Sequence, residues 1–500
     1  MEKRVFILFL TIALVHVIGG KAAALDAFGD KIDLSFSIQQ TLNVKTHEGS
    51  RDIRYNSFRT TLRPELVYKL KESSTWNIKF YGLAAYFYDF ALDIDSPMRH
   101  SIRSEAGSRS NYKDAQRPRD SEEWLKELYV EIGYGNVFNM RLGKQIVSWG
   151  ETAEEQVADL INPMDVKYAV AFPAWEDYKL GLWMARLFYT PPGAWQDLAF
   201  ELIVIPFNFV ETRLPVAGHG FFAGNSTTAP FNLILSRIRR DCPSETFKNL
   251  ELGLRIKGYS NLWEGIDWSV SHFYSRQDTP VAAGSDGSKG YGNFILAALN
   301  LPFLQPTGAV FEYPFFHSTA FSFSTTWNKP KLLIRGESTY NSNKTYHYGT
   351  GGPIAPNTKE KDLITTSLSV KRYVELPVVS GAWNRHTPVA MTVAWYNYWM
   401  LNHEYDKESG NYIMGDTGRD STKTKMTFNV TAFFLNYQLV TDFYGAYNAN
   451  GGTMGLIRIV LQPTNSWTYV LAYQQFNEDY QPDGLGRYNN QVIFSAKYDF

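Results

Sequence analysis

The chain has 500 residues, a formal net charge of −1 at pH 7 and an aromatic content of 15%. The nearly balanced charge predicts no strong attraction to nucleic acid, so we expect no nucleic-acid partner. The single cysteine, Cys242, excludes an internal disulfide framework and a cysteine-rich metal site. The sequence also contains no Cys-x-x-Cys-His motif for haem attachment. We therefore expect no metal and no cofactor.

Residues 1–24 have the organisation of a secretory signal peptide. Lys3 and Arg4 precede an apolar run over residues 5–18, and the alanines at 22–24 offer a cleavage site. The alternative is a membrane anchor, but the run is shorter than the roughly 20 residues that a spanning helix needs. No linker or shift in composition divides the remainder, so residues 25–500 are expected to form one domain.

Period-two alternation recurs along that domain, with apolar residues on one face and mostly polar residues on the other. The segments lie at residues 31–44, 55–70, 76–90, 124–134, 136–149, 176–190, 195–206, 248–259, 265–276, 315–328, 331–341, 361–374, 387–400, 422–435, 437–448, 453–462, 466–477 and 489–500. Short connections, such as 328–330, mostly alternate with long ones, such as 207–247. Outer-membrane barrels have short turns on one side and long loops on the other. We predict an all-β, antiparallel up-and-down transmembrane barrel of about 18 strands, with 16 as the alternative.

Aromatic residues cluster near the ends of many predicted strands. Trp149, Trp183, Tyr396 and Trp399 are examples. Outer-membrane barrels carry aromatic girdles at both membrane surfaces. We interpret these residues as such girdles, in contact with outer-membrane lipid and lipopolysaccharide.

The first long connection, residues 91–123, contains six Arg or Lys residues between positions 99 and 119. One interpretation is a basic surface that binds lipopolysaccharide phosphates or an anionic solute. The other is a solvated loop without a binding role, which the polar composition favours.

The polar face of the strands predicts the lining of a lumen. It carries charges of both signs, including Glu65, Glu127, Glu131 and Glu337 on the acidic side. The basic and amide members that we predict to face the pore are Arg59, Arg63, Arg141, Gln145, Arg255, Lys257, Arg335 and Arg458. A mixed lining fits a hydrated channel with no simple ion preference. Cross-strand ion pairs that fill the barrel are the structural alternative.

The fifth predicted strand runs into an unusual connection. Residues 152–160 have the pattern of a short acidic helix with Thr152 as a cap, and Asn162-Pro163 ends it. This pattern predicts that the connection folds into the lumen and constricts it, as polar loops do in other barrels. Gly150 permits a sharp turn and Trp149 wedges it against the wall, while the acids pair with luminal Arg and Lys. The constriction residues are Trp149, Gly150, Glu151, Glu154, Glu155, Asp159, Asn162 and Asp165. The alternative is a loop on the outer rim, with its acids solvated or holding a divalent cation.

The run from Arg141 to Glu151, followed by Asn162-Pro163-x-Asp165, resembles the signature of a large, poorly characterised family of Gram-negative outer-membrane barrels. That family is similar in architecture to alginate-export porins. The resemblance implies a channel, often discussed for hydrophobic or aromatic compounds. The mixed charge of the predicted lumen argues against an alginate-like polyanion as the solute.

The last eleven residues alternate in the same way and end on Phe500, with Tyr498 two places before it. This strand resembles the closing strand of outer-membrane barrels, which is similar to the signal read by the barrel-assembly machinery. That machinery is therefore an expected partner.

No catalytic residue is expected, and the chain is not predicted to be an enzyme. His-Glu-x-x-His and Gly-x-Ser-x-Gly are both absent. The predicted function is passive passage of a small or amphipathic solute, selected by the bore and its charges. The alternative is a structural barrel that sheathes a partner protein.

Overall fold

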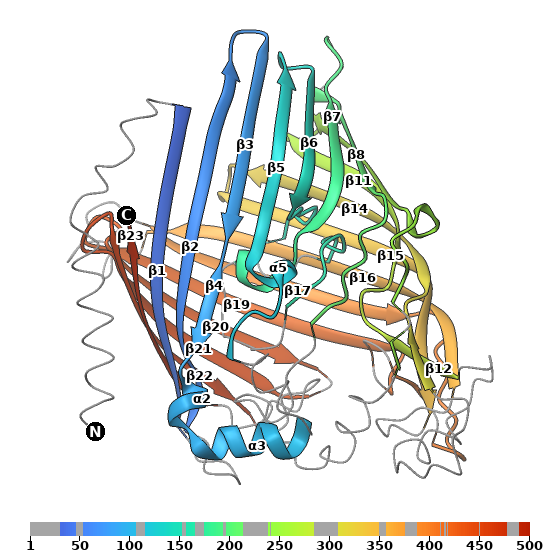
Figure 1. The fold of residues 1–500 in the computed structure, drawn as a ribbon. Helices are drawn as coiled ribbons and strands as arrows, with labels where there is room; N and C mark the ends of the chain where they lie inside the picture. Colours follow the sequence, from blue (N-terminus) through green and yellow to red (C-terminus); the bar gives the residue numbers. More distant parts are fainter. Residues whose placement is uncertain are drawn as a thin grey trace.

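Eighteen strands close into one antiparallel barrel in the computed structural model (Figure 1). The structure describes residues 31–46, 54–106, 116–152, 157–165, 175–193, 197–213, 239–240, 242–284, 309–349, 357–375, 388–410, 412–414, 417, 419–449, 451–477 and 490–500. The predicted signal peptide lies outside these residues. Within them, no helix is long and apolar enough to span a membrane.

The barrel strands follow one another around the ring in chain order. They are β1 (Ile32–Lys45), β2 (Tyr55–Glu72), β3 (Trp76–Ala84), β5 (Leu125–Tyr134), β6 (Phe138–Gln145), β7 (Leu182–Tyr189), β8 (Ala199–Ile205), β10 (Glu251–Ser260), β11 (Ile266–Arg276), β14 (Phe315–Trp327), β15 (Leu332–Gly349), β16 (Asn357–Val374), β17 (Val389–Met400), β19 (Thr422–Phe434), β20 (Leu439–Asn448), β21 (Thr453–Leu461), β22 (Trp467–Phe476) and β23 (Gln491–Asp499). The ring closes because β23 pairs with β1, where Gln40 lies opposite Ala496. The predicted fold class and the count of 18 strands are confirmed, and the alternative of 16 is wrong.

Two differences from the predicted boundaries have simple causes. β4 (Tyr86–Asp89) continues β3 along β2 after an interruption at Ala85, so the third predicted strand is split but keeps its place in the ring. β15 and β16 are longer than predicted, because residues on both sides of their connection continue to pair, as Tyr346 does with Lys359.

Smaller elements lie on the connections between barrel strands. β18 (Tyr412–Met414) pairs with the extended end of β15. A separate three-stranded sheet contains β9 (Arg239–Arg240), β12 (Val281–Gly284) and β13 (Ala309–Glu312). The short helices are α2 (Ala91–Ile94), α3 (Ser96–Ala106), α5 (Ser121–Trp124), α6 (Trp175–Tyr178) and the 3-10 helix η5 (Phe247–Asn249).

The two faces of each strand differ as the period-two pattern predicts. Leu254 on β10 and Phe494 on β23 point outward and expose 49% and 53% of their surface, whereas their neighbours Arg255 and Ser495 are buried on the inner side. An apolar exterior around a closed sheet is the surface of a transmembrane β-barrel.

The predicted aromatic girdle is right at some positions and wrong at others. Trp183 and Trp399 are exposed on the outward face, as a girdle requires. Trp149 and Tyr396 are instead buried inside the barrel. Alternation near a strand end cannot distinguish an aromatic ring in the membrane surface from one that packs inward, because both satisfy the same pattern.

The first long connection is partly helical, which corrects the expectation of a solvated loop over residues 91–123. Helices α2 and α3 lie at the end of the barrel that carries the long connections (Figure 1). Leu92, Met98 and Ile102 form a small core with Tyr55 and Phe58 of β2. The four apolar positions at 91, 92, 98 and 102 drive this docking, because a solvated loop would leave them in water. Residues 107–115, which hold part of the basic run, lie outside the described residues.

Candidate functional site

The described part of the connection after β6, residues 146–152 and 157–165, lies against the inner wall of the barrel, and we call these residues the inner segment. It begins where β6 ends at Gln145. Just before that point, Gly143 has φ of 137°, and an added Cβ would lie 2.2 Å from the backbone oxygen of Leu128. Glycine is therefore required at this position, since a side chain would be strained and would collide with β5.

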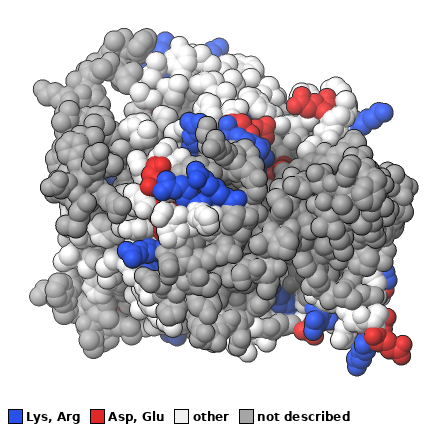
Figure 2. All heavy atoms as spheres, turned by 60° about the horizontal axis from the view of Figure 1, so that its bottom comes forward, with Lys and Arg blue, Asp and Glu red and all other residues white. Residues whose placement is uncertain are grey.

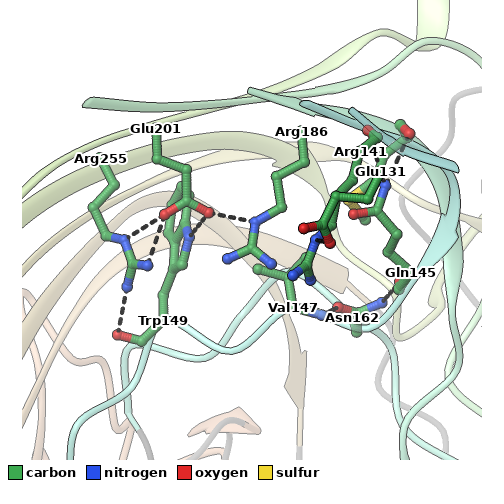
Figure 3. A network of polar contacts seen from close by, with 10 residues as sticks. Glu131, Arg141, Gln145, Val147, Trp149, Asn162, Arg186, Glu201 and Arg255 are labelled. Atoms are coloured by element: carbon green, nitrogen blue, oxygen red, sulfur yellow. Dashed lines mark hydrogen bonds and ion pairs between the residues drawn. The ribbon is translucent and has the colours of Figure 1, made fainter. Parts of the chain in front are cut away.

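Trp149 fastens the inner segment to β8 (Figure 3). Its indole Nε1 donates a hydrogen bond of 3.1 Å to Glu201 Oε1, and the carboxylate also accepts from Arg186 Nε at 2.7 Å and Arg255 Nε at 2.9 Å. Glu201 is only 1% exposed. A carboxylate buried this deeply is costly unless it is paired and hydrogen-bonded, and here both conditions are met. The Trp149–Glu201–Arg255 contacts thus tie three parts of the chain together.

The indole of Trp149 packs against β10. An added Cβ at Gly253 would lie 2.7 Å from Trp149 Cη2, so the absence of a side chain at Gly253 makes room for the ring. Phe273 of β11 meets the same ring edge-on, with centroids 6.3 Å apart. Trp149, the predicted wedge, therefore packs against the wall at β10 and β11, three and four strands away from β6.

Glu337 of β15 holds the next part of the inner segment through its backbone. The carboxylate accepts hydrogen bonds from the backbone N–H groups of Glu151 and Thr152, and from that of Ala158 at 3.0 Å. Sequence reasoning expected the reverse arrangement, in which acids of the segment pair with basic residues of the wall. It missed this role of Glu337 because a backbone N–H group leaves no mark in the sequence.

The predicted helix over residues 152–160 is described only at its two ends. Residues 153–156, which include Glu154 and Glu155, lie outside the described residues. Val157 and Ala158 form a turn. Glu151 is exposed and interacts electrostatically with Arg255 and Lys257.

Asp159 and Asn162 anchor the far part of the inner segment. Asp159 forms an ion pair of 3.1 Å with Lys179, and both side chains are buried. Burial raises the pKa of the Asp159 carboxyl, and the Lys179 ammonium opposes that rise. Asn162 accepts from the backbone N–H of Val147 at 2.7 Å and donates to the backbone oxygens of Gln145 and Leu180 at 3.0 and 2.8 Å (Figure 3 shows the first two). Asn162 therefore closes the segment back onto the end of β6.

The inner segment also reaches the opposite wall. Val157 packs with Ala394 and Tyr396 on β17. In the ring, β6 and β17 are separated by seven strands on one side and nine on the other. A segment that leaves one wall and packs against the other must cross the interior of the barrel.

Other predicted pore residues mostly have acidic partners. Ion pairs join Arg59 to Asp89 at 3.9 Å, Arg63 to Asp177, Arg141 to Glu131 at 2.7 Å and Arg458 to Asp442 at 2.6 Å. Lys257 and Arg335 are half-buried, and Gln145 is buried at the end of β6. Asp165 lies on a short bridge to Arg213. The lining thus contains many of the cross-strand ion pairs that the structural alternative predicts.

Several side chains of this site were not singled out from the sequence. Arg186, Glu201 and Lys179 were absent from the predicted set, and Gly253 has no chemical signature of its own. The inward phase of β7 and β8 is a signal that could have indicated the first two residues.

The fold and the site together define a transmembrane β-barrel with a segment folded across its interior. The chain belongs to the family described as "Protein of unknown function (DUF1302)", whose model matches residues 8–500. Comparison with curated proteins found no match.

Solved barrels with a similar course include one from Salmonella typhi, "OmpF complex with Daunomycin", with 10% identity, a TM-score of 0.41 and coverage of 94% of this chain and 98% of that chain. Acinetobacter baumannii OccAB4 has 9% identity, a TM-score of 0.47 and coverage of 94% and 98%. Pseudomonas aeruginosa OpdK with vanillate has 7% identity, a TM-score of 0.47 and coverage of 94% and 99%. Such identities say nothing about the solute of this chain.

Proposed function

We propose that the protein is a channel in the outer membrane of a Gram-negative bacterium, through which a small or amphipathic solute passes passively. The inner segment is the constriction of this channel. The observation that carries the proposal is its course from β6, past Glu201 and Glu337, to Tyr396 on β17. A segment that crosses the interior narrows any path along the barrel axis, and its anchors hold it there.

The charge of the wall supports a solute without a strong charge of its own. Many inward basic groups are matched by an acid, as Arg141 is by Glu131 and Arg458 is by Asp442. Matched pairs produce short-range fields of both signs rather than one attractive sign, so a polyanion such as alginate gains little. The Trp-Gly-Glu and Asn-Pro-x-Asp elements resemble those of a family often discussed as channels for hydrophobic or aromatic compounds, and we propose a solute of that kind.

The contacts of the barrel with its surroundings are part of the same proposal. The outward girdle residues Trp183 and Trp399 contact lipid and lipopolysaccharide, and the strand that ends at Phe500 is recognised by the barrel-assembly machinery. Phe500 continues the β23 pairing by donating its backbone N–H to the oxygen of Phe36 at 2.9 Å.

Planar-bilayer conductance of the refolded protein tests the proposal. The variant replaces residues 152–159 with a glycine-serine linker of equal length, which keeps Asn162 and its hydrogen bonds. The matched control replaces residues 403–410, an equal length of the connection between β17 and β18. We expect a small conductance for the parent and the control, and a several-fold larger one for the variant.

The structural alternative predicts a different outcome. A barrel that sheathes a partner protein has a closed lumen, so neither the parent nor the linker variant would conduct. A linker variant that conducts no more than the control would show that the inner segment is not the constriction.

A further inference from the structure

A cavity of about 290 Å³ lies behind the inner segment, between that segment and the wall. Its lining comes from residues 159–164 of the inner segment, from Lys179, from β7 at Leu182, from residues 208–210 and 277–279, and from β10, β11, β14 and β15. This volume is at the small end of the roughly 300–1,000 Å³ typical of small-molecule sites. Asp159, Asn162 and Lys179, which anchor the inner segment, form part of this lining.

The cavity wall is mainly apolar. Ile161, Leu182, Val210 and Phe316 contribute buried hydrophobic side chains, and Phe209 adds a second aromatic ring. The apolar part of the wall offers no compensation for a solvated charge, so a charged group placed against it would lose more hydration than it regains.

The charged groups of the lining are already engaged with one another or with neighbouring polar groups. Three are acidic (Asp159, Glu251 and Asp278) and three are basic (Lys179, Arg276 and Lys344). Asp159 pairs with Lys179. Glu251 accepts from Ser275 Oγ at 2.9 Å, and Asp278 accepts from Thr212 Oγ1 at 2.7 Å. The lining thus contains equal numbers of acidic and basic side chains.

Two polar atoms of the lining, Asn341 Oδ1 and Asp159 Oδ1, accept no hydrogen bond in the part of the chain that the structure describes. Asn341 on β15 is 4% exposed, and its side-chain oxygen accepts no hydrogen bond from the described residues. A buried carboxamide oxygen without a donor costs about 1–3 kcal/mol, which water or a guest molecule with a hydroxyl group would recover.

We propose that this cavity is a binding site for a neutral, mainly apolar molecule of one or two rings that carries a hydroxyl donor. Its ring fills the space between Leu182, Val210 and Phe316, and its hydroxyl donates to Asn341 Oδ1. The site builds on the proposed channel by assigning a solute class, and its position beside the constriction makes it a resting place on the path. Its occupancy is nevertheless measurable without transport.

Equilibrium dialysis against the full-length protein in lipid nanodiscs tests the site, with empty nanodiscs as the blank. The probes are p-cresol, toluene, which lacks the hydroxyl group, and 4-methylbenzoate, which carries a charge. We expect p-cresol to bind more tightly than toluene, and 4-methylbenzoate to bind more weakly than either neutral probe.

Three variants locate the binding. Asn341→Leu removes the hydrogen-bond acceptor. It should weaken the binding of p-cresol roughly three- to tenfold and change the binding of toluene less than twofold. Met164→Trp adds volume from a partly exposed lining position and should weaken both neutral probes by more than about tenfold. Asn397→Leu, the same change on β17 outside the cavity, should change neither. Retention of the compact band on unheated gels shows that each variant is folded.

Three results would overturn the inference. They are the absence of saturable binding of the neutral probes to the parent, equal effects of Asn341→Leu and Asn397→Leu, and binding of 4-methylbenzoate as tight as that of p-cresol. None of these results tests the proposed channel, because the conductance experiment on the linker variant uses none of these probes. Conversely, a barrel that binds p-cresol at Asn341 but never conducts would keep the site and refute the channel.

Discussion

Glu337→Gln is the sharpest perturbation of the proposed constriction. The carboxylate has two oxygens, one for the backbone N–H groups of Glu151 and Thr152 and the other for that of Ala158. Glutamine supplies one oxygen, so at least one buried N–H group loses its acceptor. Such a group costs about 1–3 kcal/mol, which shifts the equilibrium between docked and released inner segment by roughly 5- to 150-fold.

Single-channel recording at fixed voltage measures that shift. We expect Glu337→Gln to produce frequent transitions to a higher conductance that the parent shows seldom. Glu65→Gln is the matched control, because Glu65 is also an inward carboxylate but accepts from Tyr81 at 3.0 Å and Ser35 at 3.3 Å, outside the inner segment. Equal traces for the two variants would refute the idea that Glu337 holds the segment in the path.

Three further predictions concern packing, selectivity and pH. Gly253→Val should lower the free energy of unfolding by about 1–3 kcal/mol in urea titrations, because the added side chain would collide with the indole of Trp149. Gly455→Val should not lower it, because the space around Gly455 is open. Equal losses for the two variants would contradict the packing argument. Arg458→Ala should make the channel more cation-selective and Asp442→Asn more anion-selective, as measured by the reversal potential in a KCl gradient. Identical shifts of the reversal potential would show that this pair does not face the permeation path. The raised pKa of Asp159 means that docking of the inner segment is strongest below the ordinary value of 3.8 and weakens as pH rises through the raised pKa. Openings should therefore become more frequent in the parent as pH rises from 3.8 through the raised pKa, but not in Asp159→Asn, and a flat parent profile would contradict the assignment.

The barrel itself could be predicted from the sequence because every strand repeats the same local rule. Alternation with period two, as in Phe494 and Ser495, records which side chains meet lipid and which meet the interior. The alternating lengths of the connections then determine the antiparallel order, and closure of β23 onto β1 follows from it. None of these inferences needs contacts between distant residues.

The interior could be predicted only in part. Arg141 and Arg458, which were predicted to face the pore, pair with acids on neighbouring strands, but the pairing of Glu201 with Arg186 and Arg255 depends on which strands become neighbours in space. The acids of the inner segment were expected to pair with basic residues. Asp159 does pair with Lys179, whereas the contacts with Glu337 come from backbone N–H groups of the segment. Side-chain identity carries little information about such contacts.

The junction between β1 and β23 has a consequence for assembly. Thr41 and Ser495, whose hydroxyl groups are 3.2 Å apart across it, are separated by 454 positions in the chain. Contacts between such distant positions form late, because the entropy of closing the whole ring must be overcome first. Until then both terminal strands present unpaired backbone groups that favour aggregation, so we expect assembly to be more efficient when another protein covers these edges.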